Sequence, residues 1–320
     1  MDKSTHRVDV VEVHLEKHPN ADSLSIVKVF GYTVCVRTSD WRDSMLGAYI
    51  PPDSIVPNTP MFSFLGEHRR IKVKKLRGIV SMGLLMPAPE GAKVGDNVAE
   101  QMGVTHYDPP VNASTGGDNC HPPEGFHPVY DVDSWRRYKH LFHEGEEIVA
   151  TEKIHGANGR WVFINNEMFS GSHTGWKKYD PKILWWSALA QNPWIEAFCK
   201  THPGVTLYGE VYGQVQDLKY GTVPGSYKVR IFDIMTLGNW WPYADVVKEA
   251  ERSALELVPL VFRGPYNAVE MEKMSDGPSL IPGANHLREG IVVKPMVERT
   301  DPEIGRVQLK IVSNQYLERT

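Results

Sequence analysis

The sequence has little cysteine, no long apolar run and no apolar leader at its N-terminus. Its three cysteines, Cys35, Cys120 and Cys199, are spaced too widely for a zinc-ligand pattern or a disulfide framework. No stretch reaches the roughly 18 apolar residues that a membrane-spanning helix needs, and the N-terminal residues 1–7 lead into no signal peptide. We therefore expect a protein of a reducing cytoplasm, with no membrane among its partners.

A strong excess of charge of one sign is also absent. The 35 lysines and arginines nearly balance 39 aspartates and glutamates, which leaves a formal net charge of −4. This balance argues against a generally basic coat for nucleic acid, so any such contact must come from a local basic patch. The sequence is long, however. Its 320 residues, of which 41% are hydrophobic, suffice for two domains that each have a hydrophobic core.

Residues 1–108 are predicted to form a small β-barrel. Short apolar stretches separated by turn residues run from about 7 to 105, and residues 24–29 and 32–36 flank Phe30-Gly31 as a predicted hairpin. Several strands within fewer than 100 residues are typical of a small barrel.

This first module contains a basic segment, residues 68–77, with six lysines and arginines in ten residues. We expect it to contact a nucleic-acid backbone, although a strand edge kept basic to prevent aggregation would show the same pattern. The residues predicted to bind nucleic acid are Arg69, Arg70, Lys72 and Lys74.

Residues 109–127 are rich in proline and glycine and are predicted to form a linker. The second domain, residues 128–320, mixes strands with helices predicted at 135–142, 183–198 and 244–257. The predicted fold class is therefore α+β, with the barrel followed by a domain built on an antiparallel sheet.

The residues with the clearest chemistry follow a predicted strand at 147–151. Lys153 lies at the end of this strand-like stretch, and Gly156 and Asn158 follow the lysine closely. A lysine nucleophile must be neutral, which requires neighbours or desolvation that lower its pKa. Gly156 would let the backbone approach a phosphate, and Asn158 offers a donor and an acceptor to a sugar or phosphate.

Residues 152–158, Glu-Lys-Ile-His-Gly-Ala-Asn, resemble motif I of the ATP-dependent RNA ligases, in the covalent nucleotidyltransferase superfamily. In that family the motif lysine attacks the α-phosphate of ATP and becomes a lysyl-adenylate. The resemblance implies that Lys153 is the catalytic nucleophile, that Glu152 and Asn158 contact the nucleotide, and that ATP is the cofactor.

Two later segments resemble the next motifs of this family in the expected order. Residues 207–213 resemble motif III, which implies that Glu210 binds the ribose. Residues 229–234 resemble the following motif, whose aromatic side chain stacks on adenine, and Phe232 is the candidate.

Two further segments resemble motifs IV and V. Residues 288–295 imply that Glu289 holds a divalent cation, for which magnesium or manganese suits a hard oxygen ligand. Residues 307–313 imply that Lys310 contacts the α-phosphate. The family often has a second lysine in motif V, where this chain has Gln308 and Val312 on either side of Lys310, and Lys294 is the candidate substitute.

Many relatives also carry Ser-Arg about twenty residues after the nucleophile, where this chain has no arginine. The resemblance makes His173 or Lys177 the candidate for the phosphate contact of that arginine.

The first module resembles oligonucleotide-binding (OB) folds of the tRNA-binding type, through residues 18–24 and 75–83. The whole chain resembles most the RNA ligases with an N-terminal OB module, the Deinococcus-type branch. DNA ligases and capping enzymes place an OB domain after motif V, whereas only ten residues follow Lys310 here.

The resemblance implies an ATP-dependent RNA ligase that seals 3′-hydroxyl and 5′-phosphate ends of RNA, at nicks in duplexes, in RNA repair. It implies an OB module followed by a nucleotidyltransferase domain, ATP and magnesium or manganese as cofactors, and no obligate protein partner. The alternatives are a DNA ligase, a guanylyltransferase that uses GTP, and a non-catalytic RNA-binding protein with an inactive transferase domain.

Overall fold

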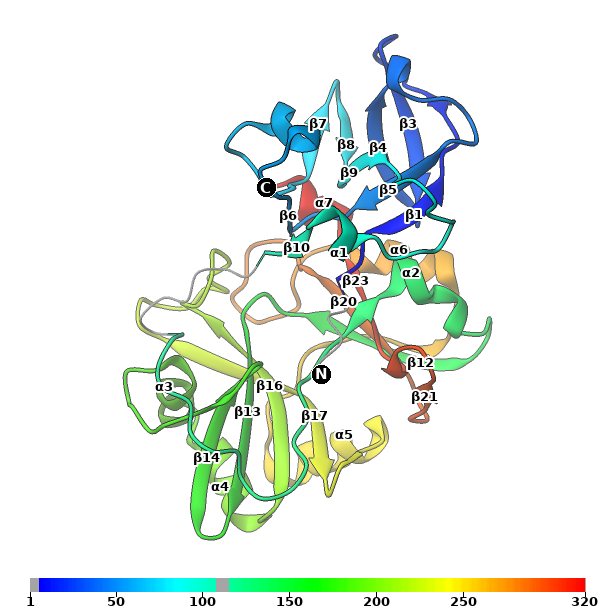
Figure 1. The fold of residues 1–320 in the computed structure, drawn as a ribbon. Helices are drawn as coiled ribbons and strands as arrows, with labels where there is room; N and C mark the ends of the chain where they lie inside the picture. The colour runs from blue at the N-terminus through cyan, green and yellow to red at the C-terminus, as the bar shows by residue number, and fades with distance from the viewer. Residues whose placement is uncertain (1–5, 108–114, 320) are drawn as a thin grey trace. The chain divides into compact units, whose positions relative to one another are not determined.

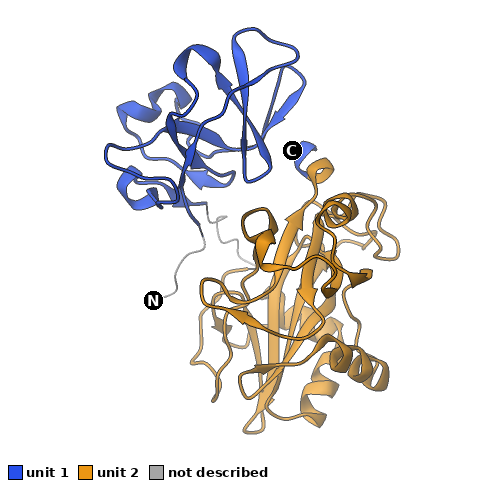
Figure 2. Cartoon of the chain, turned by 90° about the vertical axis from the view of Figure 1, so that its right-hand side faces the viewer, with its two compact units in different colours: residues 1–110, 317–320 blue, residues 111–316 orange. Residues whose placement is uncertain are grey.

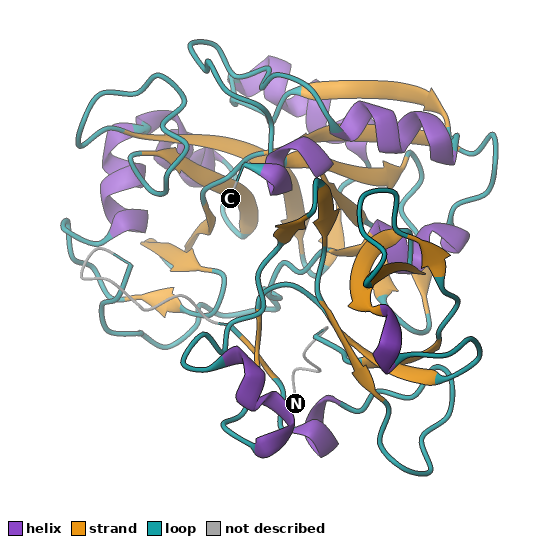
Figure 3. Ribbon diagram, turned by 90° about the horizontal axis from the view of Figure 1, so that it is seen from above, coloured by secondary structure: helices purple, strands orange, loops and turns teal. Residues whose placement is uncertain are grey.

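The computed structural model describes residues 6–107 and 115–319 (Figure 1). The chain divides into two compact units, unit 1 with residues 1–110 and 317–320 and unit 2 with residues 111–316 (Figure 2). Strands and loops make up most of the chain, and its helices are short (Figure 3). In the described residues, no helix has the length and apolar character needed to cross a membrane.

Unit 1 is built from four small sheets. Their strand orders are β1-β5-β9, β2-β3-β4, β10-β6 and β7-β8. The strands are β1 (Asp9–Glu12), β2 (Glu16–Lys17), β3 (Leu24–Val29), β4 (Tyr32–Arg37), β5 (Leu46–Ile50), β6 (Ser54–Ile55), β7 (Lys74–Leu76), β8 (Ile79–Ser81), β9 (Leu84–Pro87) and β10 (Thr105–His106). The short helices are η1 (Thr38–Asp40), η2 (Pro60–Leu65) and α1 (Ala99–Met102).

The prediction of a closed barrel for residues 1–108 is corrected by this arrangement, because the strands among residues 6–107 do not join into one closed sheet. Prolines explain part of the difference. Pro51 ends β5, and Pro57 follows the two-residue β6. Proline has no backbone N–H to donate to a ladder, so neither strand extends further.

The hairpin predicted around Phe30-Gly31 is confirmed, since β3 and β4 pair from Val29 and Tyr32 outward. A second hairpin, β7–β8, turns at Arg77-Gly78, both of which have positive φ angles of 47° and 88°. Two such residues in a two-residue loop match the right-handed twist of the strands.

Hydrogen bonds from the turn at residues 18–20 fix the position of the β7–β8 hairpin. The buried His18 donates from Nε2 to the carbonyl of Leu76 at 3.3 Å, and Asn20 Nδ2 donates to the carbonyl of Arg77 at 2.9 Å. This turn therefore fixes the position of the most basic part of unit 1.

Unit 2 contains two larger sheets, of five strands in the order β11-β23-β20-β12-β19 and of six in the order β15-β14-β13-β16-β17-β18. All neighbours pair antiparallel except β11 and β23. The strands are β11 (Asp133–Ser134), β12 (Glu147–Lys153), β13 (Ala157–Ile164), β14 (Glu167–Ser172), β15 (Trp176–Lys177), β16 (Val205–Gly213), β17 (Tyr227–Thr236), β18 (Asn239–Trp240), β19 (Leu260–Pro265), β20 (Gly290–Pro295) and β23 (Leu309–Val312), with β21 (Thr300–Asp301) and β22 (Gly305–Arg306) as a separate hairpin.

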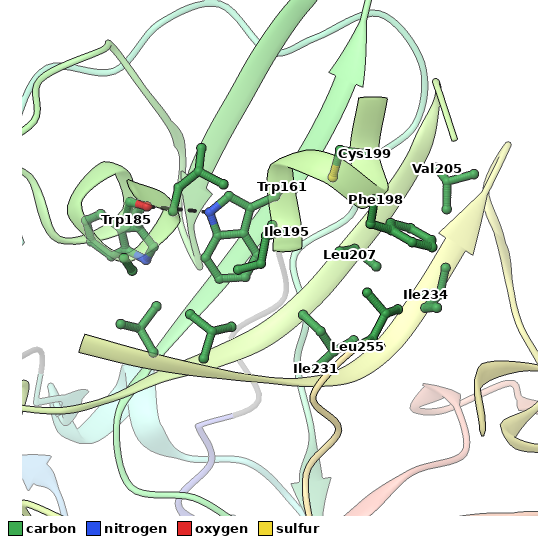
Figure 4. Packing of buried hydrophobic residues seen from close by; sticks show 14 of the residues in the cluster. Trp161, Trp185, Ile195, Phe198, Cys199, Val205, Leu207, Ile231, Ile234 and Leu255 are labelled. Atoms are coloured by element: carbon green, nitrogen blue, oxygen red, sulfur yellow. Dashed lines mark hydrogen bonds between the residues drawn. The ribbon is translucent and has the colours of Figure 1, made fainter. Parts of the chain in front are cut away.

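Each sheet of unit 2 has its own core. The six-stranded sheet packs against α3 and α4 through Trp161, Ile195 and Phe198, with Leu255 beyond α5 (Figure 4). The five-stranded sheet packs its buried aliphatic residues against α2 and α6. The helices are α2 (Trp135–Tyr138), η3 (Lys139–Leu141), α3 (Leu184–Gln191), α4 (Pro193–Thr201), α5 (Tyr243–Ser253), α6 (Ala268–Ser275) and α7 (Asn314–Glu318).

Two of the predicted helices differ from the observed ones. The helix predicted over 183–198 is two helices, because Pro193 begins a new helix and cannot donate a hydrogen bond to the previous one. The helix predicted to reach residue 257 ends at Ser253, where Ala254 takes a left-handed conformation with φ of 52°.

Part of the stretch predicted as a linker belongs to unit 2 and forms backbone hydrogen bonds with β15 and the residue that follows it. Cys120 donates its N–H to the carbonyl of Trp176 at 2.9 Å, and Lys178 donates its N–H to the carbonyl of Asp118 at 3.0 Å. Residues 109–114 of the predicted linker lie outside the described residues.

Candidate active site

The candidate site lies where the chain passes from one sheet of unit 2 to the other. Strand β12 of the five-stranded sheet ends at Lys153, and β13 of the six-stranded sheet begins at Ala157. Gly156 lies on this crossing, and a Cβ atom there would come within 2.1 Å of the carbonyl oxygen of Val211. The structure thus gives a second reason for Gly156, in the close approach of the chain to β16.

Strand register brings the charged residues of the five-stranded sheet together. Lys153 is paired with Gly290 across β12 and β20, which places Glu289 beside the lysine. The Nζ atom of Lys153 lies 2.7 Å from Oε1 of Glu289. Lys310, on β23, is paired with Val292 of β20, so its strand follows β20 on the side away from β12.

The ion pair decides the protonation state of Lys153. Burial lowers the pKa of Lys153, but the carboxylates of Glu289 and Glu210 outweigh this effect and hold the pKa above its ordinary value. The neutral amine expected for a nucleophile is therefore not the resting state of this site. Lys153 must lose its partner and a proton before it can attack.

The six-stranded sheet contributes Asn158 and Glu210, which face each other across β13 and β16. Burial raises the pKa of Glu210 to about 8, although Lys153 partly offsets it. Burial alone would also raise the pKa of Glu289, but Lys153 and His155 lower it to about 2. The two carboxyl groups thus differ in charge near neutral pH, with Glu289 ionised and Glu210 largely protonated.

His155 joins this cluster from the crossing segment. Its Nδ1 atom lies 3.5 Å from Oε2 of Glu289 and 3.2 Å from the hydroxyl of Tyr316. Its Nε2 atom lies 2.8 Å from Oδ1 of Asp217. The imidazole therefore bridges two carboxylates, a role that the sequence analysis did not assign to it.

Phe232 and Tyr130 form an aromatic wall beside these polar groups. Their ring centroids are 4.3 Å apart, and the Tyr130 hydroxyl donates to Asp233 and to Oε1 of Gln308. Sequence reasoning missed Tyr130, because it lies among prolines just after the predicted linker. An isolated tyrosine there has no strand pattern around it.

These residues enclose a cavity of about 260 Å³, called here the nucleotide cavity. Its walls contain eight of the residues predicted from the sequence, namely Glu152, Lys153, Asn158, His173, Glu210, Phe232, Lys294 and Lys310. Glu289 adjoins it through its ion pair with Lys153.

Lys294 reaches this cavity with its charge already neutralised. Its Nζ atom donates to Oδ1 of Asp233 at 2.7 Å and to the carbonyl of Phe232 at 3.2 Å. Asp233 also accepts from both terminal nitrogens of Arg306. Two buried cations therefore share one carboxylate, which favours a structural role for Lys294 over the phosphate contact predicted for it.

Gln308 belongs to the same network, since its Nε2 atom donates to the carbonyl of Asp131. Lys310 has no ion-pair partner in the described residues within 4 Å. Burial, and then the nearby charge of Lys153, lower the pKa of Lys310. Of the two lysines predicted to contact phosphate, Lys310 is the one without a direct ion-pair partner in the described residues, although Glu289, Asp133 and Asp131 lie near enough to act on its pKa.

Glu152 and His173 are held by neighbours within unit 2. The Glu152 carboxylate accepts from the hydroxyl of Ser279 at 2.5 Å and from the N–H of Leu280 at 2.6 Å. His173 Nε2 lies 2.9 Å from Oδ1 of Asp131. Both side chains border the nucleotide cavity while fixing a loop or a turn beside it.

A divalent cation fits the donor set near Glu289. Its buried Oε2 atom has His155 Nδ1 at 3.5 Å as its neighbour, and the buried Oδ1 of Asn158 has no hydrogen-bond partner in the described residues. Carboxylate oxygen suits magnesium or manganese, which commonly take their remaining ligands from water and phosphate. The described residues contain no group of three or more His, Cys, Asp or Glu side chains arranged to hold a metal alone.

The residues predicted to bind nucleic acid all lie in unit 1. Arg69, Lys72 and Lys74 are exposed. Arg70 instead donates to Oδ1 of Asp53 at 2.6 Å and lies 3.7 Å from the ring centre of Tyr107. Arg70, Lys72 and Lys74 line a cavity of about 330 Å³ within this unit, together with apolar residues such as Ile71.

Comparison with known families gives two matches along this chain. The sequence pattern of the RNA ligase family matches residues 146–312. That of an OB-fold domain matches residues 7–88, which supports the OB assignment despite the separate sheets. No curated protein sequence matches the chain.

Several solved structures share the fold over nearly the whole chain. The Naegleria gruberi RNA ligase with pyrophosphate is 20% identical, with a TM-score of 0.83 and 98% of each chain covered. A lysine-to-alanine mutant with ATP and manganese is 21% identical, with a TM-score of 0.81 and 98% of each chain covered. A glutamate-to-alanine mutant with AMP and manganese is 22% identical, with a TM-score of 0.82 and the same coverage.

Proposed function

Because this chain belongs to the RNA ligase family, we propose that it joins RNA ends with ATP through a covalent adenylate on Lys153. The proposed substrates are a 3′-hydroxyl and a 5′-phosphate end of RNA, brought together at a nick in a duplex. The observation that carries this proposal is the pairing of Lys153 with Glu289 beside a cavity whose walls include Tyr130 and Phe232.

The shape and chemistry of the nucleotide cavity support ATP as the ligand. Phe232, backed by Tyr130, offers an aromatic face for adenine. Glu210 and Asn158 offer donors and acceptors for the ribose or a phosphate. Lys153 and Lys310 supply the positive charge that an α-phosphate requires.

In the first step, the amine of Lys153 attacks the α-phosphorus of ATP. A bond forms between Nζ and phosphorus, the bond to the bridging oxygen breaks, and pyrophosphate leaves. Before the attack Lys153 releases its proton to water, because Glu289, with a pKa of about 2, is too weak a base to keep it. A divalent cation near Glu289, when bound, would offset the charge of the phosphate oxygens.

In the second step, a 5′-phosphate oxygen of the RNA attacks the same phosphorus and Lys153 leaves as an amine. In the third, the 3′-hydroxyl attacks the activated 5′-phosphate, and AMP departs. Lys310 can stabilise the first two transition states, because both place negative charge on the non-bridging oxygens of the α-phosphate, and in the third step it can stabilise the AMP that departs.

The proposal is tested by the mass of the intact protein after incubation with ATP and manganese. The wild-type chain should gain one AMP, and the Lys153→Ala variant should gain none while retaining its circular dichroism spectrum. An adduct on another lysine would contradict the site assignment. The absence of any adduct under magnesium or manganese would favour a non-catalytic RNA-binding protein.

A further inference from the structure

A loop of unit 2, residues 214–226 between β16 and β17, contacts the crossing segment that joins β12 to β13. The backbone N–H of His155 donates to the hydroxyl of Tyr220 at 2.7 Å. The next residue of the crossing segment, Gly156, accepts a hydrogen bond at its carbonyl from Nε2 of Gln216. Two side chains of one loop therefore fix the backbone that follows the proposed nucleophile.

The same loop also orients the ring of His155. Its Nε2 atom lies 2.8 Å from Oδ1 of Asp217, and because an ionised carboxylate can only accept, Nε2 is the donor. This bond directs the other ring nitrogen, Nδ1, towards Oε2 of Glu289 at 3.5 Å. Since Glu289 is the ion-pair partner of Lys153, Asp217 acts on the nucleophile through two neighbours.

Tyr220 has an uncommon backbone conformation for a bulky residue. Its φ angle is 50°, in the left-handed region that such residues rarely adopt. Its ring is 2% exposed and packs edge-on against His286 and Tyr212, with ring centres 4.5 Å and 5.1 Å away. Conformations of this kind persist where the surrounding structure fixes them, and they are frequent at functional sites. The two rings thus fix the point at which the hydroxyl meets the crossing segment.

A second loop, residues 276–288, holds the chain on the other side of the nucleophile. It donates two hydrogen bonds to the carboxylate of Glu152, the residue before the lysine. The two loops approach each other closely, because a Cβ atom at Gly221 would lie 2.3 Å from the carbonyl oxygen of Gly283. The residues before and after the nucleophile are therefore held by two loops that also contact each other.

We propose that Tyr220 and Asp217 are positioning residues for adenylylation, which hold the crossing segment so that the amine of Lys153 lies in line with the bond that breaks in ATP. The inference rests on the proposed function, because it takes Lys153 as the nucleophile.

The residues that line the nucleotide cavity in the described part of the chain include neither Tyr220 nor Asp217. Their effect is therefore on the geometry of Lys153 and not on the binding of ATP. A displacement of a reacting group by about 1 Å can slow a reaction about 100-fold, so hydrogen bonds that fix the path of the chain next to the nucleophile bear directly on the rate.

The test uses the full chain with Tyr220→Phe, which removes the hydroxyl and keeps the ring. The rate of adenylylation in a single turnover is measured over a range of ATP concentrations, together with the joining of an RNA that is already adenylylated. The matched control is Tyr212→Phe. Tyr212 is buried against the ring of Tyr220, but its hydroxyl accepts from Nε of Arg230 at 3.4 Å instead of from the crossing segment.

We expect Tyr220→Phe to slow the limiting rate of adenylylation by about 10- to 100-fold and to leave the apparent KM for ATP within a few-fold of the wild-type value. Joining of the pre-adenylylated RNA should stay near the wild-type rate, because that step does not use the amine of Lys153 as a nucleophile. Tyr212→Phe should slow neither reaction. A wild-type rate of adenylylation in Tyr220→Phe, or an equal loss in both reactions, would overturn the inference.

A second pair of variants covers the case in which loss of the buried hydroxyl impairs folding. Asp217 is exposed, and Asp217→Ala should slow adenylylation by about 10-fold, the scale for one lost hydrogen bond. Asp217→Asn should restore most of the rate, because its amide oxygen can still accept from Nε2 of His155. An asparagine variant as slow as the alanine variant would show that Asp217 acts through its charge and would overturn its positioning role. A wild-type chain that forms no lysyl-adenylate would instead overturn the proposed function itself.

Discussion

Three ionisable groups at the centre of the site control one another's charge. Lys153 and Glu289 form an ion pair 2.7 Å long, and Glu210 lies close enough for its pKa to respond to both. Lys153 forms its ion pair with Glu289 rather than with Glu210. The effect of burial on Glu210 therefore outweighs the attraction of Lys153 and raises the pKa of Glu210 to about 8. The resting site thus stores a proton on Glu210 and another on Lys153.

This arrangement predicts how stability depends on pH. The folded-state pKa of Glu210 lies above its ordinary value of 4.5, so its contribution to stability is complete below about pH 4.5 and is lost as pH rises through about 8. The Glu210→Gln variant does not lose stability in this way, because glutamine does not titrate. Its melting temperature relative to wild type should therefore rise between about pH 5 and about pH 8.5. A difference that stays constant over this range would show that Glu210 is ionised in the folded protein.

The two lysines proposed to contact phosphate should respond differently to substitution. Lys294 is paired with the buried Asp233, so Lys294→Met should lower the free energy of unfolding by about 3 kcal/mol, the scale for breaking a buried ion pair. Lys310→Met should leave folding intact and slow sealing by at least about 100-fold. Urea unfolding and a sealing assay on the same preparations check both. The reverse pattern would make Lys294 the phosphate ligand.

At the scale of elements, the β7–β8 hairpin and the segment before it hold six lysines and arginines within residues 68–77 of unit 1. His18 and Asn20 bond the carbonyls of Leu76 and Arg77 and so hold the hairpin in place. Arg70 is partnered by Asp53, so it contributes less to binding than its position in the sequence suggests. The exposed Arg69, Lys72 and Lys74 remain the proposed contacts to RNA.

We therefore expect the triple change of Arg69, Lys72 and Lys74 to alanine to weaken binding of a nicked RNA duplex. The slope of log affinity against log salt should fall by about 2 to 3, close to one for each lost phosphate contact. Changing Lys17, Lys28 and Lys93 to alanine removes the same charge from other exposed positions of unit 1 and serves as the control. Equal loss in both variants would show that only net charge matters.

At the scale of the whole molecule, the chemistry and the basic segment occupy different units. The nucleotide cavity is lined entirely by residues between Tyr130 and Lys310, within unit 2. The basic residues from Arg69 to Arg77 belong to unit 1. This division suggests that adenylylation and RNA binding can be separated.

A truncated protein that begins at Val111 should form the lysyl-adenylate but bind and seal a nicked RNA duplex poorly. The start retains residues 118–120, which hydrogen-bond to β15 and its neighbour. Adenylylation and sealing are measured on the same preparation. Sealing at the wild-type rate would remove unit 1 from substrate binding. A folded but unreactive fragment would show that the nucleotide pocket needs unit 1.

Through its resemblance to the RNA ligase motifs, the sequence by itself pointed to most of the residues that line the nucleotide cavity, although not to Tyr130. Lys153, Glu210, Phe232 and Lys310 lie on strands, and pairing of these strands brings them into one cavity. The β3–β4 hairpin was equally predictable, because Phe30-Gly31 is a local signal between two alternating stretches. A local sequence pattern is sufficient to predict a structural element, such as this hairpin, that depends only on residues close together in the chain.

Only the tertiary structure decided the charge of each group. The partner of Lys294 is Asp233, 61 residues away, and the partner of Lys153 is Glu289, across a strand pair. A pKa depends on burial and on charges within a few ångströms, and neither can be read from neighbours in the sequence.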